Sequence, residues 1–360
     1  MYLCNRIFKL NSLQAKISDN ILLDLNELVG NKPSNAIFIL TDEQTKKYCL
    51  PKLLEIERLR ESRIITIPSG DEHKNIESAV QIWEYLSENG ATRASLMINL
   101  GGGMITDIGG FVASTFKRGM EYINVSTTLL GAVDAATGGK TGINFLGLKN
   151  EIGTFSPAKE VLINIDFFKT LDDKNLRSGF AEMIKHALID NRESWNEIQA
   201  FDLEKFDFEK LKPLLAKNIE IKARIVNQDP TERGIRKALN LGHTFGHAFE
   251  TFSYQIGKPV LHGYAVIWGL LCELYLSHIK LNFPKEDISK LNRLIQEYYG
   301  WFHFDCKQYE TLYKLMTHDK KNESEAINFT LLSDVGEVHI NQTASKEEIF
   351  ECLDFLECRF

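Results

Sequence analysis

The sequence predicts an α/β domain with a mostly parallel, Rossmann-like sheet at the N-terminus and a mostly α-helical domain at the C-terminus. Short apolar runs alternate with helical patterns up to about residue 165, as in successive βαβ units. A glycine triplet at 101–103 directly follows one of these runs, and helical periodicity dominates from about Leu171 onward. We therefore expect domains over residues 1–167 and 168–360.

Length and composition restrict the class of protein. A chain of 360 residues is long for a single hydrophobic core and has the length typical of two domains. A net charge of −7, with dispersed basic residues, argues against nucleic acid or a membrane surface as partner. Six cysteines without a CxxC pair predict reduced thiols. Neither a signal peptide nor a long apolar stretch is present, so we expect a cytoplasmic protein.

The elements of the first domain follow from apolar runs bounded by turn residues. A helix is expected over 43–48 and another over 74–86, where apolar residues recur at helical spacing. The apolar runs predict buried strands at 36–42, 63–70, 96–100 and 161–165.

The glycine triplet lies between a predicted strand and the start of a helix. Glycines there let backbone amides approach a phosphate near the positive end of the helix, although such a turn can also serve tight packing alone. The dinucleotide fingerprint GxGxxG is absent, because the loop reads Gly-Gly-Gly-Met-Ile-Thr-Asp. A nucleotide bound in a variant manner is therefore expected.

The loops between 116 and 150 combine glycines and hydroxyl groups with Arg118, Asp134, Lys140 and Lys149. This density of polar groups in a region with few charges indicates a binding surface rather than a solvated face.

Helical patterns fill the second domain. On the first helix Glu182 and Lys185 are three residues apart, and a solvated ion pair is the simplest interpretation. Another helix is predicted over 214–226, beginning after Pro213. A strand pair over 326–340 and a closing helix over 346–355 complete the chain.

His243 and His247 are four residues apart in a helical segment, which places both rings on one face. A metal site or charged-substrate site and a pair of hydrogen-bonded buried histidines are equally good interpretations. The metalloprotease pattern is excluded because Thr244 stands where its Glu would be. His262 lies at the start of an apolar helix, where it could present a ligand.

Five motifs occur in a characteristic order: the glycine triplet, Gly-Gly-Lys at 138–140, FAEMIKHALI at 180–189, NLGHTFGHAFE at 240–250 and His-Gly at 262–263. In this the chain resembles the 3-dehydroquinate synthase family of sugar phosphate cyclases over about residues 42–336. The resemblance implies a homodimeric enzyme of dehydroquinate synthase-like fold, with a nucleotide-binding first domain and a metal-binding helical domain. NAD and a divalent metal, usually zinc or cobalt, are its implied cofactors.

The resemblance also assigns residues to the two cofactors. It implies Glu182, His243 and His262 as metal ligands, a set that leaves coordination positions open, while His247 faces substrate. The implied NAD-binding residues are Asp42, Asp71, Lys74, Gly102, Gly103, Asp107, Thr127, Thr128, Leu130, Lys149, Phe167, Thr170 and Leu171.

The implied substrate is 3-deoxy-D-arabino-heptulosonate 7-phosphate, and the implied product is 3-dehydroquinate, an intermediate of the shikimate pathway. Transient oxidation by NAD, β-elimination of phosphate, re-reduction, ring opening and an internal aldol closure connect the two. The family's polar and cationic substrate pocket, with Arg118 donated across the dimer, corresponds to Arg118, Asp134, Lys140, Lys149, Asn150, Lys185, Lys222, Arg236, Asn240, His247 and Lys320.

The chain departs from the family pattern at two positions: Tyr264 and Asp71 stand where a Glu is frequent. Neither change removes a required chemical group. The alternatives are another cyclase of the inosose or valiolone synthase type, an NAD- and metal-dependent alcohol dehydrogenase, and a catalytically silent metal-binding protein. Retention of Lys185, Lys222 and Arg236 favours a substrate that carries a carboxylate.

Overall fold

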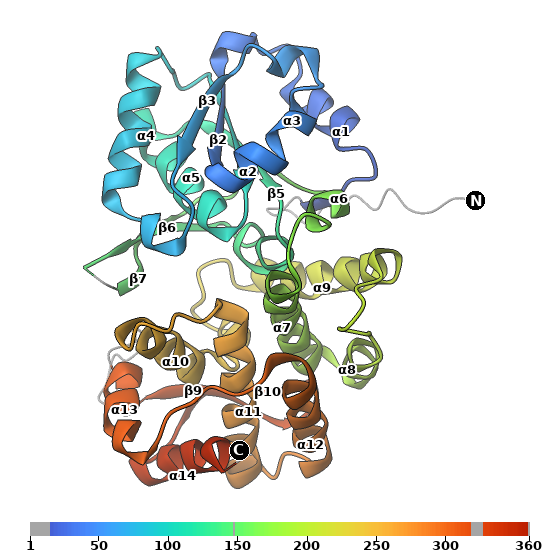
Figure 1. Cartoon of the computed structure of the whole chain (residues 1–360), viewed down its shortest axis with the longest axis vertical. Helices are drawn as coiled ribbons and strands as arrows, with labels where there is room; N and C mark the ends of the chain where they lie inside the picture. Colours follow the sequence, from blue (N-terminus) through green and yellow to red (C-terminus); the bar gives the residue numbers. More distant parts are fainter. Residues whose placement is uncertain (1–14, 147, 318–326, 359–360) are drawn as a thin grey trace. The chain divides into compact units, whose positions relative to one another are not determined.

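The computed structural model describes residues 15–146, 148–317 and 327–358. It forms two compact units, the first comprising Met1–Asp172 and Lys222–Pro230, the second Asp173–Ile221 and Thr231–Phe360 (Figure 1). The expected boundary at 167/168 lies close to the 172/173 division. The assignment of Lys222–Pro230 to the first unit was not expected from the sequence.

The first unit is built on a six-stranded sheet in which all neighbouring strands are parallel. The strand order is β1 (Ala15–Ile17), β8 (Glu160–Ile163), β5 (Glu121–Ser126), β4 (Leu96–Gly101), β2 (Ile37–Asp42) and β3 (Arg63–Ile67). This confirms the predicted mostly parallel α/β architecture.

Both faces of this sheet are covered, as a parallel sheet requires. Along β2 the side chains alternate: Phe38 and Leu40 belong to one apolar cluster, and Ile37 and Ile39 to another. The first cluster includes residues of α4 (Ile76–Glu88) and α5 (Gly103–Thr115), and the second includes residues of α1 (Ile21–Val29) and α3 (Leu50–Leu53). The short helices α2 (Glu43–Tyr48) and α6 (Ile165–Phe168) complete the unit.

An antiparallel hairpin, β6 (Lys140–Phe145) and β7 (Leu148–Phe155), extends from the first unit (Figure 1). We did not predict these strands, because glycines and polar residues interrupt their apolar alternation. The hairpin contains Lys140, Lys149 and Asn150, so part of the binding surface expected between 116 and 150 lies on it; the binding role stays a prediction.

Within its described residues, the second unit is mostly helical, as predicted, with one antiparallel strand pair. Its elements are α7 (Asp173–Asp190), α8 (Arg192–Gln199), most of α9 (Phe208–Gln228), α10 (His243–Gln255), α11 (His262–Leu281), α12 (Lys285–Leu294), α13 (Tyr309–Thr317), β9 (Asn328–Asp334), β10 (Glu337–Thr343) and α14 (Lys346–Glu357).

The expected start of a helix after Pro213 is wrong, because α9 already begins at Phe208 and contains Pro213. The carboxylate of Asp207 accepts hydrogen bonds from the amides of Glu209 and Lys210 and thereby caps the first turn. Among the described residues, no helix has the length and apolar character needed to cross a membrane.

Candidate metal centre and nucleotide-binding residues

Three side chains able to bind a metal converge in the second unit. Glu182 comes from the middle of α7, while His243 and His262 are the first residues of α10 and α11. Oε1 of Glu182 lies 3.4 Å from Nε2 of His243 and 3.4 Å from Nε2 of His262. Donor atoms about 2.1 Å from a tetrahedral ion are themselves about 3.4 Å apart. The three side chains therefore fit one divalent ion and leave a coordination position open.

Close helix packing brings these ligands together. Gly263 follows His262, and a Cβ atom on it would lie 1.9 Å from the backbone oxygen of Ser178 on α7. Instead, the amide of Gly263 donates a hydrogen bond to Oγ of Ser178 at 3.0 Å. Because Ser178 precedes Glu182 by one helical turn, the close approach of Gly263 to the backbone of Ser178 sets His262 beside the carboxylate.

The second ring nitrogen, Nδ1, of both His243 and His262 also lies within hydrogen-bonding distance of an oxygen. Nδ1 of His243 lies 3.1 Å from the carbonyl oxygen of Leu241, and Nδ1 of His262 lies 3.1 Å from Oε2 of Glu250. An oxygen acceptor at each Nδ1 keeps a ring proton on that nitrogen, so Nε2, which faces Glu182, is the nitrogen of each ring that would bind an ion.

The carboxylate of Glu182 is fully buried. Burial alone raises its pKa, but the charge of Lys185 and the hydrogen bonds from His243 and His262 outweigh this effect and hold the pKa of Glu182 well below its usual range. Lys185 forms an ion pair with Oε2 and is itself buried. The interpretation of this pair as solvated is therefore wrong, since spacing alone does not distinguish an exposed from a buried helical pair.

The pKa values of the two histidines are shifted in opposite directions. Burial, together with the charge of Lys185, lowers the pKa of His243 to about 4, so its ring is neutral and able to coordinate. Burial also opposes the charge on His262, but the carboxylates of Glu250 and Glu182 raise the pKa of His262 to about 10. The same negative field favours a metal cation.

Two carboxylates that support this centre were missed in the sequence. Glu250 contacts His262, and Glu273 accepts hydrogen bonds from the amides of Gly242 and Thr244, at 2.6 and 3.0 Å, which flank His243. Glu273 was detectable in principle, because it is the sole acidic residue within the apolar α11 segment, and such a residue needs a buried partner.

Three other expected substrate residues of the second unit, Arg236, Asn240 and His247, lie within eight residues of the ligand His243 in the sequence. The His247 ring centroid lies 5.2 Å from that of His243 and 6.0 Å from that of His262. Arg236 is buried, and Nδ2 of Asn240 donates a hydrogen bond to Oε1 of Glu232 at 2.8 Å.

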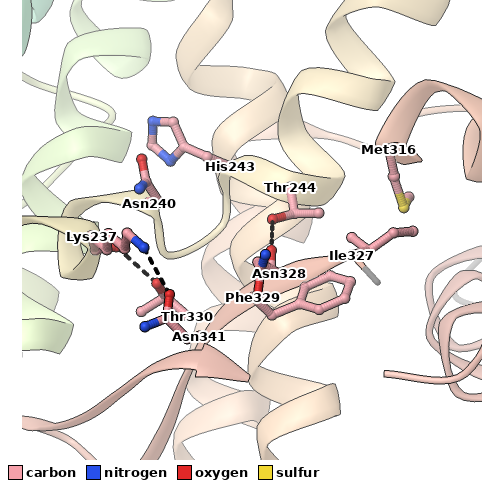
Figure 2. Close-up of a pocket in the computed structure, with 10 residues that line it drawn as sticks. All are labelled: Lys237, Asn240, His243, Thr244, Met316, Ile327, Asn328, Phe329, Thr330 and Asn341. Atoms are coloured by element: carbon pink, nitrogen blue, oxygen red, sulfur yellow. Dashed lines mark hydrogen bonds between the residues drawn. The ribbon is translucent and has the colours of Figure 1, made fainter. Parts of the chain in front are cut away.

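A pocket opens beside His243 and Asn240 (Figure 2). Its wall includes Lys237, which the sequence did not single out; Nζ of Lys237 donates a hydrogen bond to Oδ1 of Asn341 at 2.9 Å. The remaining lining residues are Thr244, Met316, Ile327, Asn328, Phe329 and Thr330. Lys320, expected to bind substrate, lies outside the described residues.

In the first unit Lys74 connects several of the expected NAD-binding residues. Its Nζ lies 3.1 Å from Oδ2 of Asp107 and 3.5 Å from Oδ1 of Asp71, and it donates to Oδ1 of Asn150 at 2.8 Å. Lys149 pairs with the other oxygen of Asp71 at 3.1 Å. Burial alone lowers the pKa of Lys74, but Asp107 and Asp71 outweigh it and raise the pKa above its ordinary value.

The glycine turn at 101–103 is tightly packed, as expected if its glycines serve packing alone. A Cβ atom on Gly102 would lie 2.9 Å from Cγ2 of Thr128, and one on Gly103 would lie 2.9 Å from Cβ of Ala135. Gly102 also caps the N-terminus of α5, where backbone amides favour an anion. Tight packing thus accounts for the glycines, and phosphate binding stays a prediction.

Asp42, Thr127 and Thr170, three of the expected NAD-binding residues, lie around the thiol of Cys49. Burial and the charge of Asp42 raise the pKa of Cys49 to about 12, so the thiol is uncharged. Cys49 belongs to no sequence motif, and pattern analysis had no means of finding it.

The remaining expected residues also have defined places in the first unit. Nζ of Lys222 lies 2.5 Å from Oδ1 of Asp134, and Arg118 is exposed on the short 3-10 helix Phe116–Arg118 that follows α5. Lys140 begins β6, Leu130 follows β5, and Phe167, Thr170 and Leu171 lie in or just after α6.

Comparison with known proteins gives the family. Residues 64–178 match the family model described as 3-dehydroquinate synthase N-terminal, and residues 179–322 match the one described as 3-dehydroquinate synthase C-terminal. The 3-dehydroquinate synthase of Parabacteroides distasonis is 50% identical over 339 residues, which cover 94% of this chain and 96% of the relative.

Solved structures share the fold at low sequence identity. The 2-epi-5-epi-valiolone synthase of Streptomyces hygroscopicus subsp. jinggangensis, with NAD+ and Zn2+ bound, gives a TM-score of 0.86 at 22% identity and covers 98% of both chains. A 2-deoxy-scyllo-inosose synthase complexed with carbaglucose-6-phosphate, NAD+ and Co2+ gives 0.83 at 20% identity, covering 94% of this chain and 96% of its own. With both family models matched and half the residues shared with a full-length relative, the chain belongs to the 3-dehydroquinate synthase family.

Proposed function

We propose that the chain converts 3-deoxy-D-arabino-heptulosonate 7-phosphate into 3-dehydroquinate and phosphate. The convergence of Glu182, His243 and His262 in a member of this family is the observation that carries the proposal. These residues would hold a divalent ion, zinc or cobalt, while the residues around Lys74 and the glycine turn would hold NAD. When bound, the ion polarises a substrate hydroxyl and NAD accepts and returns a hydride.

The chain's own side chains would bind and orient an anionic sugar. Lys185 and Arg236 in the second unit, and Lys140 and Lys222 in the first, supply cations for a carboxylate and a phosphate. Asp134, paired with Lys222, would orient a substrate hydroxyl. Asn240 and His247 would steer proton removal by holding the group that accepts the proton.

An assay of phosphate release tests this proposal. With NAD and Co2+ or Zn2+ present, we expect phosphate and 3-dehydroquinate to form in equal amounts without net accumulation of NADH. A chelator should stop the reaction, and the added metal should restore it. Phosphate release only from a different sugar phosphate would assign the chain to another cyclase reaction, and steady NADH formation would indicate a dehydrogenase.

We also propose that the enzyme is a cytoplasmic homodimer. The described cysteines are free, two of them exposed, as expected in a reducing compartment. The β6–β7 hairpin exposes the apolar side chains of Phe145, Leu146, Leu148, Ile152 and Phe155, which is typical of a protein interface.

The position of Arg118 supports a role across such a dimer. Arg118 follows the C-terminal end of α5, whereas Gly102 caps the N-terminal end of the same 13-residue helix. A helix of that length spans about 20 Å. Arg118 is thus remote from the glycine turn of its own chain, and we infer that it serves the partner subunit.

A further inference from the structure

We propose that Glu250 is a positioning residue that holds the ring of His262 in the orientation needed for metal binding. The inference rests on the proposed function of Glu182, His243 and His262 as metal ligands. Glu250 lies on the third turn of α10 and is 2% exposed. Its Oε2 atom lies 3.1 Å from Nδ1 of His262.

The ring of His262 is held from two sides. Nδ1 faces Glu250, and Nε2 lies 3.4 Å from Oε1 of Glu182. A carboxylate at Nδ1 keeps the proton on that nitrogen, aims the Nε2 lone pair at the ion and makes the imidazole a stronger electron donor.

His262 needs this support more than His243 does. The side chain of His262 is 26% exposed against 11% for His243, so packing restricts its ring less. His262 also begins its helix directly after the turn that joins α10 to α11. A fixed acceptor at Nδ1 therefore supplies an orientation that packing does not.

Ser253 links the backbone of Glu250 to the turn that precedes His262. Oγ of Ser253 donates a hydrogen bond to the carbonyl oxygen of Glu250 at 2.6 Å and accepts one from the amide of Val260 at 3.2 Å. Helix α10 thus carries the ligand His243, the carboxylate of Glu250 that orients His262, and Ser253, which hydrogen-bonds to the turn before His262.

The affinity for metal in the absence of NAD and substrate tests the proposal. For Glu250→Ala we expect Zn2+ and Co2+ to bind about 100-fold more weakly than in the wild type. Glu250→Gln keeps an oxygen acceptor without the charge and should recover part of the loss. Competition with a chromophoric chelator measures the affinity, and the visible absorption of bound Co2+ should change in both variants.

Glu160→Gln is the matched control, because Glu160 is another buried carboxylate, 8% exposed, at the start of β8 in the first unit. It should bind metal like the wild type. If Glu250→Ala lowers the folded fraction, Glu250→Gln decides alone. Wild-type affinity and an unchanged Co2+ spectrum in a folded Glu250 variant would overturn the inference.

Failure of the proposed function would look different. A wild-type protein that binds metal tightly but releases no phosphate from the heptulosonate would contradict the proposed reaction and leave the role of Glu250 intact. A wild-type protein that turns over normally, together with a Glu250→Gln variant of unchanged metal affinity, would contradict the role of Glu250 alone.

Discussion

The two oxygens of Glu182 face different partners: Oε2 pairs with Lys185, and Oε1 faces the Nε2 atoms of His243 and His262. Glu182 and Lys185 are both fully buried, where an unpaired charge is costly. The carboxylate therefore contributes both to stability and to the proposed metal site, and the two contributions can be separated by mutation.

We predict that Glu182→Gln lowers the free energy of unfolding by about 3 kcal/mol, because it leaves the buried ammonium of Lys185 without a counter-charge. The double variant Glu182→Gln/Lys185→Met should regain much of this stability but no metal binding. Urea unfolding and metal analysis of the purified proteins measure the two effects. A stoichiometric ion bound to Glu182→Gln would contradict the ligand assignment.

Among the elements, the contact between α7 and α11 determines the geometry of the site. Gly263→Ala places a methyl group against the backbone oxygen of Ser178, so α11 must move away from α7. We expect a loss of about 3 kcal/mol in unfolding free energy and weaker Co2+ binding.

Ser178→Ala is the control for this contact, because it removes the hydrogen bond to the Gly263 amide without adding bulk. Its cost should be about 1 kcal/mol, with metal affinity close to that of the wild type. Chemical unfolding and Co2+ titration compare the two variants. A Gly263→Ala protein with unchanged affinity would show that this packing does not place His262.

Asp287 on α12 ties α8 to α12 within the second unit. Nε1 of Trp195 donates to Oδ1 at 2.8 Å, and Nη1 of Arg192 donates to Oδ2 at 2.6 Å. Burial alone raises the pKa of Asp287, but the hydrogen bonds from Arg192 and Trp195 outweigh it and lower the pKa below its ordinary value.

A lowered folded-state pKa gives stability that is present above the unfolded-state value, about 3.9 for Asp, and is lost as the pH falls through the folded-state value. We predict that Asp287→Asn costs about 2 kcal/mol at pH 7 and that its difference from the wild type shrinks below about pH 4. Asp334→Asn, which changes a half-exposed partner of Arg192, should cost less. Urea unfolding at several pH values measures this; a difference independent of pH would contradict it.

Local sequence signals predicted many elements. Residues 43–48 form the helix expected there, because Asp42 caps it and Pro51 follows its end. The β6–β7 hairpin was missed because glycines and polar residues interrupt the apolar runs by which buried strands are recognised, and because most of β7 is exposed.

For the site, the motifs identified Glu182, His243 and His262, and the structure brings their ligand atoms within 4.8 Å of one another. Glu250 was beyond prediction, since it acts through a contact with a residue distant in sequence. Glu273 could have been singled out as the acidic residue of an apolar helix, but its contacts with Gly242 and Thr244 could not. The burial of Lys185 could not be predicted either, because it depends on packing between residues distant in sequence.

At the scale of the whole molecule, the expected NAD-binding residues belong to the first unit and the expected metal ligands to the second. The proposed function also depends on dimer formation, for which the exposed β6–β7 hairpin is the proposed contact. We predict that Leu146→Glu/Phe155→Glu, which places charges at side chains 85% and 58% exposed, converts the proposed dimer into a monomer.

The monomer should still bind metal but lose most of its activity, because the partner's Arg118 is then absent. Analytical ultracentrifugation and the phosphate-release assay measure these effects. Leu23→Glu is the matched control, since Leu23 is an apolar residue 62% exposed on α1, and it should stay dimeric and active. A double hairpin variant that remains a dimer would place the interface elsewhere.

Anomalous X-ray diffraction from crystals grown with Co2+ most directly tests whether Glu182, His243 and His262 bind the ion on which the proposed reaction depends. We expect one strong peak about 2.0–2.2 Å from Oε1 of Glu182 and from Nε2 of each histidine. A peak held by other residues, with these three side chains turned away from it, would contradict the proposed metal centre.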